Sequence, residues 1–320
     1  MRVVVTGATG NAGTSLLHAL TQDPAIEEIV GLARRRPELD LPRTRWVSAD
    51  VATDDLSGHF RGADCVVHLA WLIQPSRDRA TTRAVNVEGS RRVFEATAEA
   101  GVESLVYASS VGAYSPGPKD RTVDESWPTG GIQTSFYSRD KAEVERILDR
   151  FEAEHPDMRV VRLRPGLIFM SQAASGIRRL FAGPLLPSPL LRPQLIPIVP
   201  ATDRLRFQAV HSLDVGEAYH RAITRDVHGP FNIAAEPVLD PPELGRLLGA
   251  RPVPVSEKAL RAAVQMSWKL RLQPSPPGWL DMALGVPLMD TSRARNELGW
   301  TATRSAGDAL LELLEGMRRG

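Results

Sequence analysis

The sequence predicts an α/β fold, a doubly wound parallel sheet with helices on both faces, and three observations lead to this prediction. Short apolar runs rich in β-branched residues alternate with longer segments whose apolar residues recur at helical spacing. A glycine-rich turn separates the first of these runs from the first helical segment. The composition is that of a globular chain with a core, because 42% of the 320 residues are hydrophobic and 24% are charged.

The alternation is regular through the first half of the chain. Strands are expected at residues 2–6, 28–33, 45–48, 64–69, 103–108 and 159–163, and helices at 11–22, 78–100 and 134–154. Leu16, Leu17 and Leu20 give the first helix an apolar face, and Gly101 ends the long second helix. Repetition of strand, helix and strand is typical of a parallel sheet that is covered on both faces.

Charge and composition exclude several classes of partner. The 39 Lys and Arg residues against 38 Asp and Glu leave a net charge of +1, without the basic excess of a nucleic-acid-binding protein. No stretch approaches the ~20 apolar residues that span a bilayer, and the N-terminus lacks the pattern of a secretory signal. One cysteine, Cys65, excludes a disulfide framework, and the histidines lack metal-ligand spacing, so no metal site is expected. We expect a cytoplasmic protein that acts on a small molecule.

The turn after the first strand has the features of a phosphate-binding loop. It reads Thr-Gly-Ala-Thr-Gly-Asn-Ala-Gly over residues 6–13. Gly7, Gly10 and Gly13 leave the backbone free of side chains, so that it can approach a pyrophosphate closely. The following helix points its N-terminal N–H groups at the phosphates. The residues expected to hold the pyrophosphate are Gly7, Thr9, Gly10, Asn11, Ala12 and Gly13.

The spacing of these glycines, G-x-x-G-x-x-G, resembles the phosphate loop of the extended short-chain dehydrogenase/reductase family, which holds epimerases, dehydratases and reductases. This resemblance implies a Rossmann-like core and extends nearly to Met317. It places Asp50 and Val51 along the adenine and Asn86 near the nicotinamide. It further implies that the ends of later strands face the cofactor through Leu69, Ala70, Ala108, Pro165 and Ile168. A homodimer through residues 78–100 and 134–154 is also expected from the resemblance.

The second strand ends in Ala33-Arg34-Arg35, and this end bears on the choice of cofactor. A carboxylate at this place would accept hydrogen bonds from the ribose of NAD, whereas arginine suits the 2′-phosphate of NADP. With no acid in reach, Arg34 and Arg35 favour NADP, and NAD stays possible. The alternative is that both arginines belong to a solvated cluster between strand and loop.

Tyr137 and Lys141 are four residues apart in a predicted helix, so both side chains lie on one face. A phenol with a pKa near 10 is a poor base unless a nearby cation favours the phenolate, and Lys141 can supply that charge. Tyr137 can then exchange a proton with a substrate oxygen. The segment around Ser109-Ser110 resembles the serine-bearing strand end of the family, and its register picks Ser110 as the hydroxyl that polarises the substrate carbonyl.

The second half of the chain classifies less clearly. We expect a dinucleotide-binding core over residues 1–165 and mostly a substrate-binding lobe over 166–320, with segments near 206–226 returning to the core. Strands are expected at 207–211 and 230–233 and helices at 214–224 and 305–317. Residues 183–200 hold six prolines and are either a surface loop or a lid over the substrate cleft.

Three functional hypotheses remain open. The favoured one is an NADP-dependent oxidoreductase that transfers a hydride between an alcohol and a carbonyl. The first alternative is a nucleotide-sugar epimerase or dehydratase with tightly bound NAD. Two departures from the sugar-nucleotide members weaken this alternative. Phe207 stands where those members carry an arginine, and Arg206 lies one place away. Pro165-Gly166 replaces the aromatic residue and the asparagine that those members usually carry after the sixth strand. The second alternative is a non-catalytic NADP-binding sensor, although such relatives usually lack the Tyr/Lys pair.

Two further groups of residues are interpreted as structural. His68 and Cys65 lie in the fourth predicted strand and are expected to be packed in the core. Asp124 and Glu125 could approach the substrate, but a solvated loop is the favoured interpretation.

Overall fold

The structure, a computed structural model, describes residues 1–74, 77–171 and 197–319. Its centre is a seven-stranded sheet in the order β11-β7-β5-β4-β1-β2-β3, in which every pair of neighbours is parallel. The strands are β1 (Arg2–Thr6), β2 (Glu28–Ala33), β3 (Thr44–Ser48), β4 (Cys65–His68), β5 (Ser104–Ala108), β7 (Arg159–Pro165) and β11 (Gly229–Ile233). The predicted doubly wound parallel sheet is therefore confirmed.

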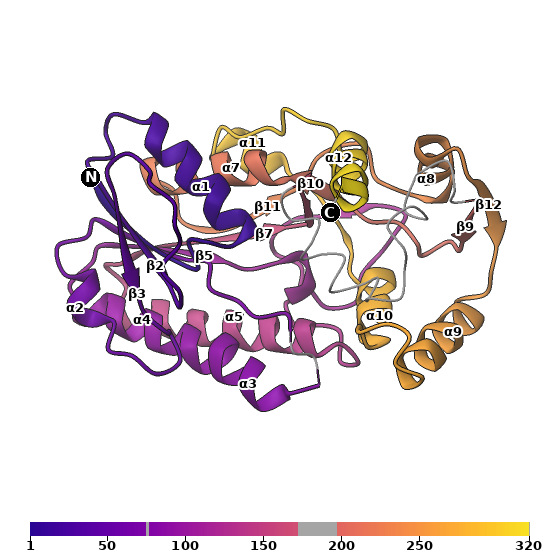
Figure 1. The fold of residues 1–320 in the computed structure, drawn as a ribbon, viewed down its shortest axis with the longest axis horizontal. Coiled ribbons are helices and arrows are strands. Elements are labelled where there is room, and N and C mark those ends of the chain that lie inside the picture. The colour runs from indigo at the N-terminus through magenta and orange to yellow at the C-terminus, as the bar shows by residue number, and fades with distance from the viewer. Residues whose placement is uncertain (75–76, 172–196, 320) are drawn as a thin grey trace.

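Helices cover both faces of this sheet (Figure 1). One face carries α1 (Asn11–Gln22), α7 (Ser212–Thr224) and α11 (Ser292–Asn296), and the other carries α2 (Ser57–Phe60), α3 (Arg79–Arg83), α4 (Gly89–Glu99) and α5 (Phe136–Glu154). Each face has its own apolar cluster, one containing Val3, Val5 and Leu16 and the other Val4, Val30 and Phe94. The alternation of Val3, Val4 and Val5 between the two clusters follows from the two-residue period of a strand.

The predicted helix over 78–100 consists of three joined pieces. α3 and α4 are linked by a π-helical turn, Ala84–Glu88, which contains Asn86. Such turns are rare and often lie at functional sites. The helix expected over 134–154 begins at Phe136, because Ser135 caps it by accepting a hydrogen bond from the Ser138 N–H. The use of these helices in a homodimer stays a prediction.

The second half of the chain both completes the sheet and builds a group of smaller elements. α7 packs against α1, and β11 forms the edge of the main sheet. The chain therefore returns to the core through Ile233, beyond the expected 206–226, and again around α11. The smaller elements are β6 (Thr122–Val123), β8 (Leu167–Phe169), β9 (Ile198–Ala201), β10 (Ala209–His211), β12 (Arg251–Pro254), β13 (Leu288–Met289), α8 (Pro241–Leu248), α9 (Glu257–Lys269), α10 (Gly278–Gly285) and α12 (Ala306–Arg319). The short strands pair as β10 with β8, β12 with β9 and β13 with β6.

Two expectations about this half need correction or stay open. The strand predicted over 207–211 is only β10, since Phe207 makes an isolated antiparallel bridge with Leu239 before it. Most of the proline-rich segment 183–200 lies outside the described residues, so a lid there stays a prediction. Its last residues form β9, an edge strand in which Pro200 is tolerated.

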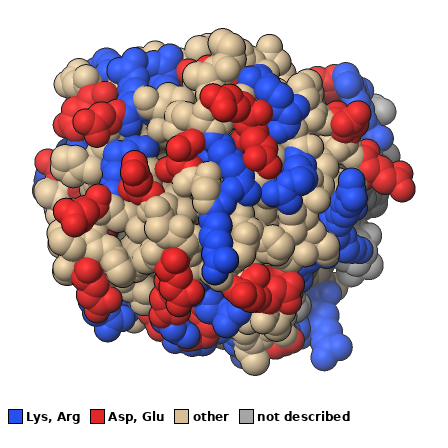
Figure 2. All heavy atoms as spheres, turned by 90° about the vertical axis from the view of Figure 1, so that its left-hand side faces the viewer, with Lys and Arg blue, Asp and Glu red and all other residues tan. Residues whose placement is uncertain are grey.

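The face drawn in Figure 2 is of mixed charge. Figure 2 shows acidic and basic side chains interspersed over the face that carries the N-terminal end of the sheet, without a region of one sign. Of the helices in the described ranges, none combines the length and the apolar character that a bilayer span requires.

Candidate active site

The phosphate turn joins β1 to α1 at the carboxyl edge of the sheet. Gly7 has a φ of +70°, and a Cβ there would lie 2.6 Å from the Ala70 nitrogen. A Cβ on Gly13 would lie 2.5 Å from the Gly7 carbonyl oxygen, so this turn accepts no larger residue at either place. The N-cap of α1 is Gly10, with no side chain capping the helix and no acid in its first turn. The positive end of α1 is therefore open toward the loop.

This turn fits a dinucleotide pyrophosphate. The Asn11 Oδ1 atom is buried without a hydrogen-bond partner among the described residues, which leaves one acceptor available beside the helix N-terminus. Thr9 and Gly10 are exposed, and Asn11 and Ala12 are half-buried. Close backbone approach and open N–H groups are the features that bind the phosphates of a cofactor.

The ends of β2 and β3 supply the residues expected around the adenosine half. Ala33 is buried, whereas Arg34 and Arg35 are exposed and make no ion pair within the described ranges. The Asp50 carboxylate accepts from the Ala52 N–H at 2.9 Å, and Val51 is buried against α4 at Gly89. The arginines are therefore available to a ligand, while Asp50 shapes its own turn.

Asn86 acts on the segment that follows β4. Its Nδ2 donates to the Leu72 carbonyl at 2.8 Å, and its Oδ1 accepts from the Leu72 N–H at 2.7 Å. Both polar groups of the Asn86 amide are thus used to hold the segment 69–72 in place. This segment contacts Gly7 and carries Trp71. The structure shows Asn86 holding the segment after β4, and its expected place near the nicotinamide stays a prediction.

Ser110 and Tyr137 lie close together because Ser138 links helix α5, which carries Tyr137, to the turn that follows Ser110. Ser138, in the first turn of α5, donates a hydrogen bond to the Gly112 carbonyl and accepts one from the Ile132 N–H at 2.7 Å. Gly112 lies so close to Tyr137 that a Cβ on it would be 2.9 Å from the Tyr137 Cε1 atom. The Ser110 hydroxyl accepts from the Gly112 N–H at 3.0 Å, which fixes it at the start of the same turn.

Lys141 lies one helical turn after Tyr137 and is buried with 3% of its surface exposed. Its Nζ donates to the Ala108 carbonyl at 2.5 Å and to the Tyr107 hydroxyl at 3.4 Å. The ammonium also lies 3.5 Å from the ring centroid of Trp71. The carboxyl end of β5 therefore holds Lys141 beside the two other residues of the predicted set.

The pKa shifts of Tyr137 and Lys141 differ from the expectation that a charged Lys141 lowers the pKa of the Tyr137 phenol. Burial raises the pKa of the Tyr137 phenol above its ordinary value, and a hydrogen bond with Ser110 partly offsets this. Burial lowers the pKa of the Lys141 ammonium well below its ordinary value, and the charges of Glu145 and Asp140 oppose the decrease. The hydrogen bond with Ser110 therefore favours the phenolate of Tyr137.

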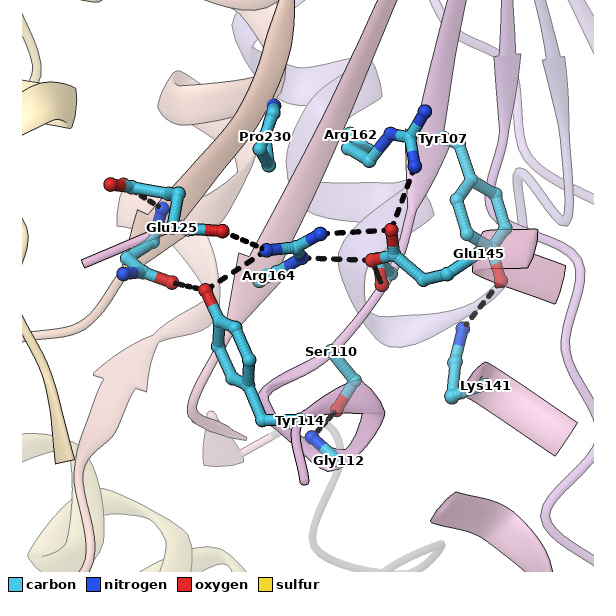
Figure 3. Close-up of polar contacts among 12 residues, drawn as sticks. Tyr107, Ser110, Gly112, Tyr114, Glu125, Lys141, Glu145, Arg162, Arg164 and Pro230 are labelled. Atoms are coloured by element: carbon cyan, nitrogen blue, oxygen red, sulfur yellow. Dashed lines mark hydrogen bonds and ion pairs between the residues drawn. The ribbon is translucent and has the colours of Figure 1, made fainter. Parts of the chain in front are cut away.

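A buried network behind the site was not anticipated from the sequence (Figure 3). Glu145, fully buried on α5, accepts from Arg164 at 2.8 and 2.9 Å, from Arg162 at 2.9 Å and from Ser109 at 2.5 Å. Burial alone would raise the pKa of the Glu145 carboxyl, but these partners together lower it to about 2. The sequence offers one sign that Glu145 belongs near the site: it lies four residues after Lys141, on the same face of the helix.

The network continues to the edge of the sheet. Arg164 also donates to the Tyr114 hydroxyl at 3.1 Å and to the Glu125 carbonyl at 2.9 Å, and the Tyr114 hydroxyl donates to Asn232 Oδ1 at 2.6 Å. The Glu125 carboxylate accepts from the Asn232 N–H at 2.8 Å. The interpretation of Glu125 as part of a solvated loop is therefore wrong, because it links the loop after β6 to β11.

Four further residues singled out in the sequence, Pro165, Ile168, His68 and Cys65, are packed against the core or lie within it. Pro165 ends β7 and is buried, and Ile168 in β8 packs against the core. His68 is buried between Thr6 at 2.7 Å and Ser90 at 2.9 Å, and burial lowers its pKa to about 3. Burial raises the pKa of the Cys65 thiol to about 11. Both are core residues, as expected.

Comparison with known proteins agrees with this geometry. The family model described as the NAD dependent epimerase/dehydratase family matches residues 3–234. An uncharacterised protein of Mycobacterium tuberculosis is 28% identical over 313 residues, which cover 97% of this chain but only 29% of that relative's length. The chain thus spans less than a third of the curated relatives that it matches first.

Solved structures show the same fold. MoeE5, in complex with UDP-glucuronic acid and NAD, has a TM-score of 0.70 and 22% identity, with 100% of this chain and 99% of that chain covered. UDP-glucuronic acid 4-epimerase from Bacillus cereus, also in complex with UDP-glucuronic acid and NAD, has a TM-score of 0.73 and 18% identity with the same coverage. At this level of identity the likeness establishes the fold.

Proposed function

Since the chain belongs to the NAD-dependent epimerase/dehydratase family, we propose that it is an NADP-dependent oxidoreductase acting on an alcohol/carbonyl pair of a small molecule. The observation that supports this most directly is the joint placement of Ser110, Tyr137 and Lys141 at the carboxyl edge of the sheet, with the phosphate turn on the same edge. Ligands of such sheets bind at this edge.

Each residue has a distinct part in the proposed reaction. A bound nicotinamide would supply or accept the hydride. Tyr137 exchanges the proton with the substrate oxygen, and Ser110 favours its phenolate and orients the same oxygen. Lys141, held by the Ala108 carbonyl, lies one helical turn after Tyr137 and faces the expected ribose. Arg34 and Arg35, exposed after β2, are the proposed ligands of a 2′-phosphate.

The test combines cofactor binding with turnover. Purified protein should bind NADPH and should reduce at least one member of a panel of aldehydes and ketones, followed by the loss of NADPH absorbance. Tyr137→Phe should lower kcat by about 10²- to 10⁴-fold without weakening NADPH binding, because only the proton donor is removed. A variant that keeps the wild-type rate would overturn the mechanism, and binding without any turnover would favour the sensor.

A nucleotide-sugar epimerase or dehydratase is the second candidate, since solved proteins of the same fold hold UDP-glucuronic acid and NAD. Such an enzyme would use the same three residues but show no net oxidation of its cofactor. NAD found by mass spectrometry in the purified protein, with interconversion of a UDP-sugar followed by chromatography, would favour it over the main proposal.

A further inference from the structure

Two tryptophans from distant parts of the chain flank Tyr137. Trp279 of α10 lies with its ring centroid 4.9 Å from that of Tyr137 at an angle of 35°. Trp71, after β4, lies 5.9 Å away with its ring nearly perpendicular to Tyr137. Both tryptophans are half-buried. From these contacts we propose that the substrate is a planar, apolar aromatic carbonyl or alcohol, whose ring packs against Trp71 and Trp279 while its oxygen reaches Tyr137.

The other neighbours of Tyr137 are also apolar. It belongs to a cluster with the buried side chains of Ile132, Met282 and Val286, and Val111 packs against the same cluster. On the side of Gly112, a Cβ would meet the Met282 sulfur at 3.0 Å as well as the Tyr137 ring. A substrate that extends from the Tyr137 hydroxyl toward the partly buried Val111 and Trp279 gains by burying apolar surface.

Few polar groups accompany this apolar surface. The Ser110 hydroxyl stands at the reacting oxygen. The indole N–H of Trp71 is buried and lacks a hydrogen-bond partner in the described part of the chain. One unused donor next to an aromatic wall suits a flat molecule with a single acceptor, such as a ring oxygen or a hydroxyl.

In the part of the chain that the structure describes, three cations that line a second cavity are already engaged. A cavity of about 800 Å³ between β9, α8 and the loop before β6 is lined by Lys119, Arg204 and Arg206, but equally by Asp120, Asp203 and Asp240. Arg204 donates to the carbonyls of Leu284 and Gly117, at 2.8 and 3.0 Å. These two hydrogen bonds tie the segment of Arg204 to the segment around Gly117 and to the end of α10.

The other two cations are used in the same way. Arg206 donates to the Lys119 carbonyl at 2.9 Å and lies 3.6 Å from Asp240. Lys119 is buried and donates to the carbonyls of Arg206 and Ala283, at 2.7 and 2.9 Å. The three aspartates of the same cavity offset these three cations, so its described lining favours an uncharged substrate over a nucleotide sugar.

This proposal rests on the proposed function, so its test includes a readout that needs no turnover. We would measure binding of 2-naphthol and of UDP to the NADP-loaded protein by calorimetry, and reduction of 2-naphthaldehyde and of decanal by NADPH. Trp279→Ala should weaken 2-naphthol binding and raise the KM for 2-naphthaldehyde about tenfold, with the KM for decanal changed much less. Trp279→Phe should restore most of the loss.

Trp268→Ala is the matched control, because this half-buried tryptophan of α9 packs on Arg77 and not on Tyr137. It should leave both binding and turnover near the wild-type values. Absence of 2-naphthol binding, tighter binding of UDP, or an equal effect of Trp279→Ala on both aldehydes would overturn the proposed substrate class. If instead 2-naphthol binding depends on Trp279 but no carbonyl is reduced, the aromatic site stands and the proposed oxidoreductase function fails.

Discussion

The carboxylate of Glu145 and the guanidinium of Arg164 form a two-point ion pair in the interior, with donor–acceptor distances of 2.8 and 2.9 Å. The pair ties α5, which carries Tyr137 and Lys141, to β7 of the central sheet (Figure 3). Because neither side chain is more than 5% exposed, water can replace neither partner. The position of the predicted catalytic helix therefore depends on this contact.

Replacement of Glu145 should lower the stability of the folded protein. Glu145→Gln leaves Arg164 buried without its counter-charge, whereas Arg162 keeps Asp149 and Glu152. We expect the free energy of unfolding to fall by about 3–5 kcal/mol in urea titrations. Glu143→Gln is the control on the same helix, because its partner Arg83 is about half exposed. That change should cost less than about 1 kcal/mol. Equal losses in the two variants would contradict a special role for the buried pair.

The same carboxyl should give the protein a defined sensitivity to acid. The pKa of Glu145 is lowered to about 2 in the folded state from an ordinary value of 4.5. In this interval the unfolded chain binds more protons than the folded chain, so this contribution to stability is present above about pH 4.5 and is lost as the pH falls toward 2. We would measure the free energy of unfolding from about pH 6 down to about pH 2.5. It should decrease less steeply for Glu145→Gln than for the wild type. Parallel curves would rule out this contribution.

The parts of the molecule that depend on short stretches of sequence were predictable. The glycine turn after β1 and the helix register of Tyr137 and Lys141 are local patterns, and both lie at the sheet edge where parallel strands place ligand sites. The network around Glu145 depends on pairing between distant segments. Arg162 and Arg164, two residues apart in β7, share one strand face, which indicates a buried acid but not which one.

The surroundings of Tyr137 illustrate the same limit. Trp71 and Trp279 are separated by more than half of the chain, and nothing in the spacing of either residue indicates that both contact one tyrosine. Likewise, the sequence shows that Glu125 follows the fifth strand, but only the fold brings its carboxylate to the Asn232 N–H of β11. Such contacts are set by how α10 and β11 pack on the core, which local propensity does not encode.

The arginines after β2 give a prediction about cofactor choice. Arg34→Ala and Arg35→Ala should each raise the Kd for NADPH by about 10- to 100-fold, the range expected for the loss of a charge-assisted hydrogen bond to phosphate. The Kd for NADH should stay nearly constant, because NADH lacks the 2′-phosphate. Fluorescence titrations with both cofactors measure this difference. Arg36→Ala, the next exposed arginine along the chain, is the control, and an equal loss of NADPH and NADH binding would contradict the assignment.

The contact between Gly112 and Tyr137 allows the geometry of the site to be tested without removing a catalytic group. In Gly112→Ala the new Cβ would lie 2.9 Å from the Tyr137 Cε1 and 3.0 Å from the Met282 sulfur, so the tyrosine ring must shift. A displacement of about 1 Å can lower the rate by about 10²-fold, and we expect such a decrease in kcat while the affinity for NADPH is kept.

Gly58→Ala supplies the comparison for this change. Gly58 lies in α2, and a Cβ there would have no neighbouring atom within 4 Å. It should keep the wild-type kcat and gain up to about 1 kcal/mol of stability, because alanine favours the helical backbone. Should Gly112→Ala instead keep the wild-type kcat with an unchanged thermal unfolding temperature, the ring of Tyr137 is not held in a reactive position by the Gly112 turn. The joint placement of Ser110 and Tyr137 would then lose its significance for the reaction.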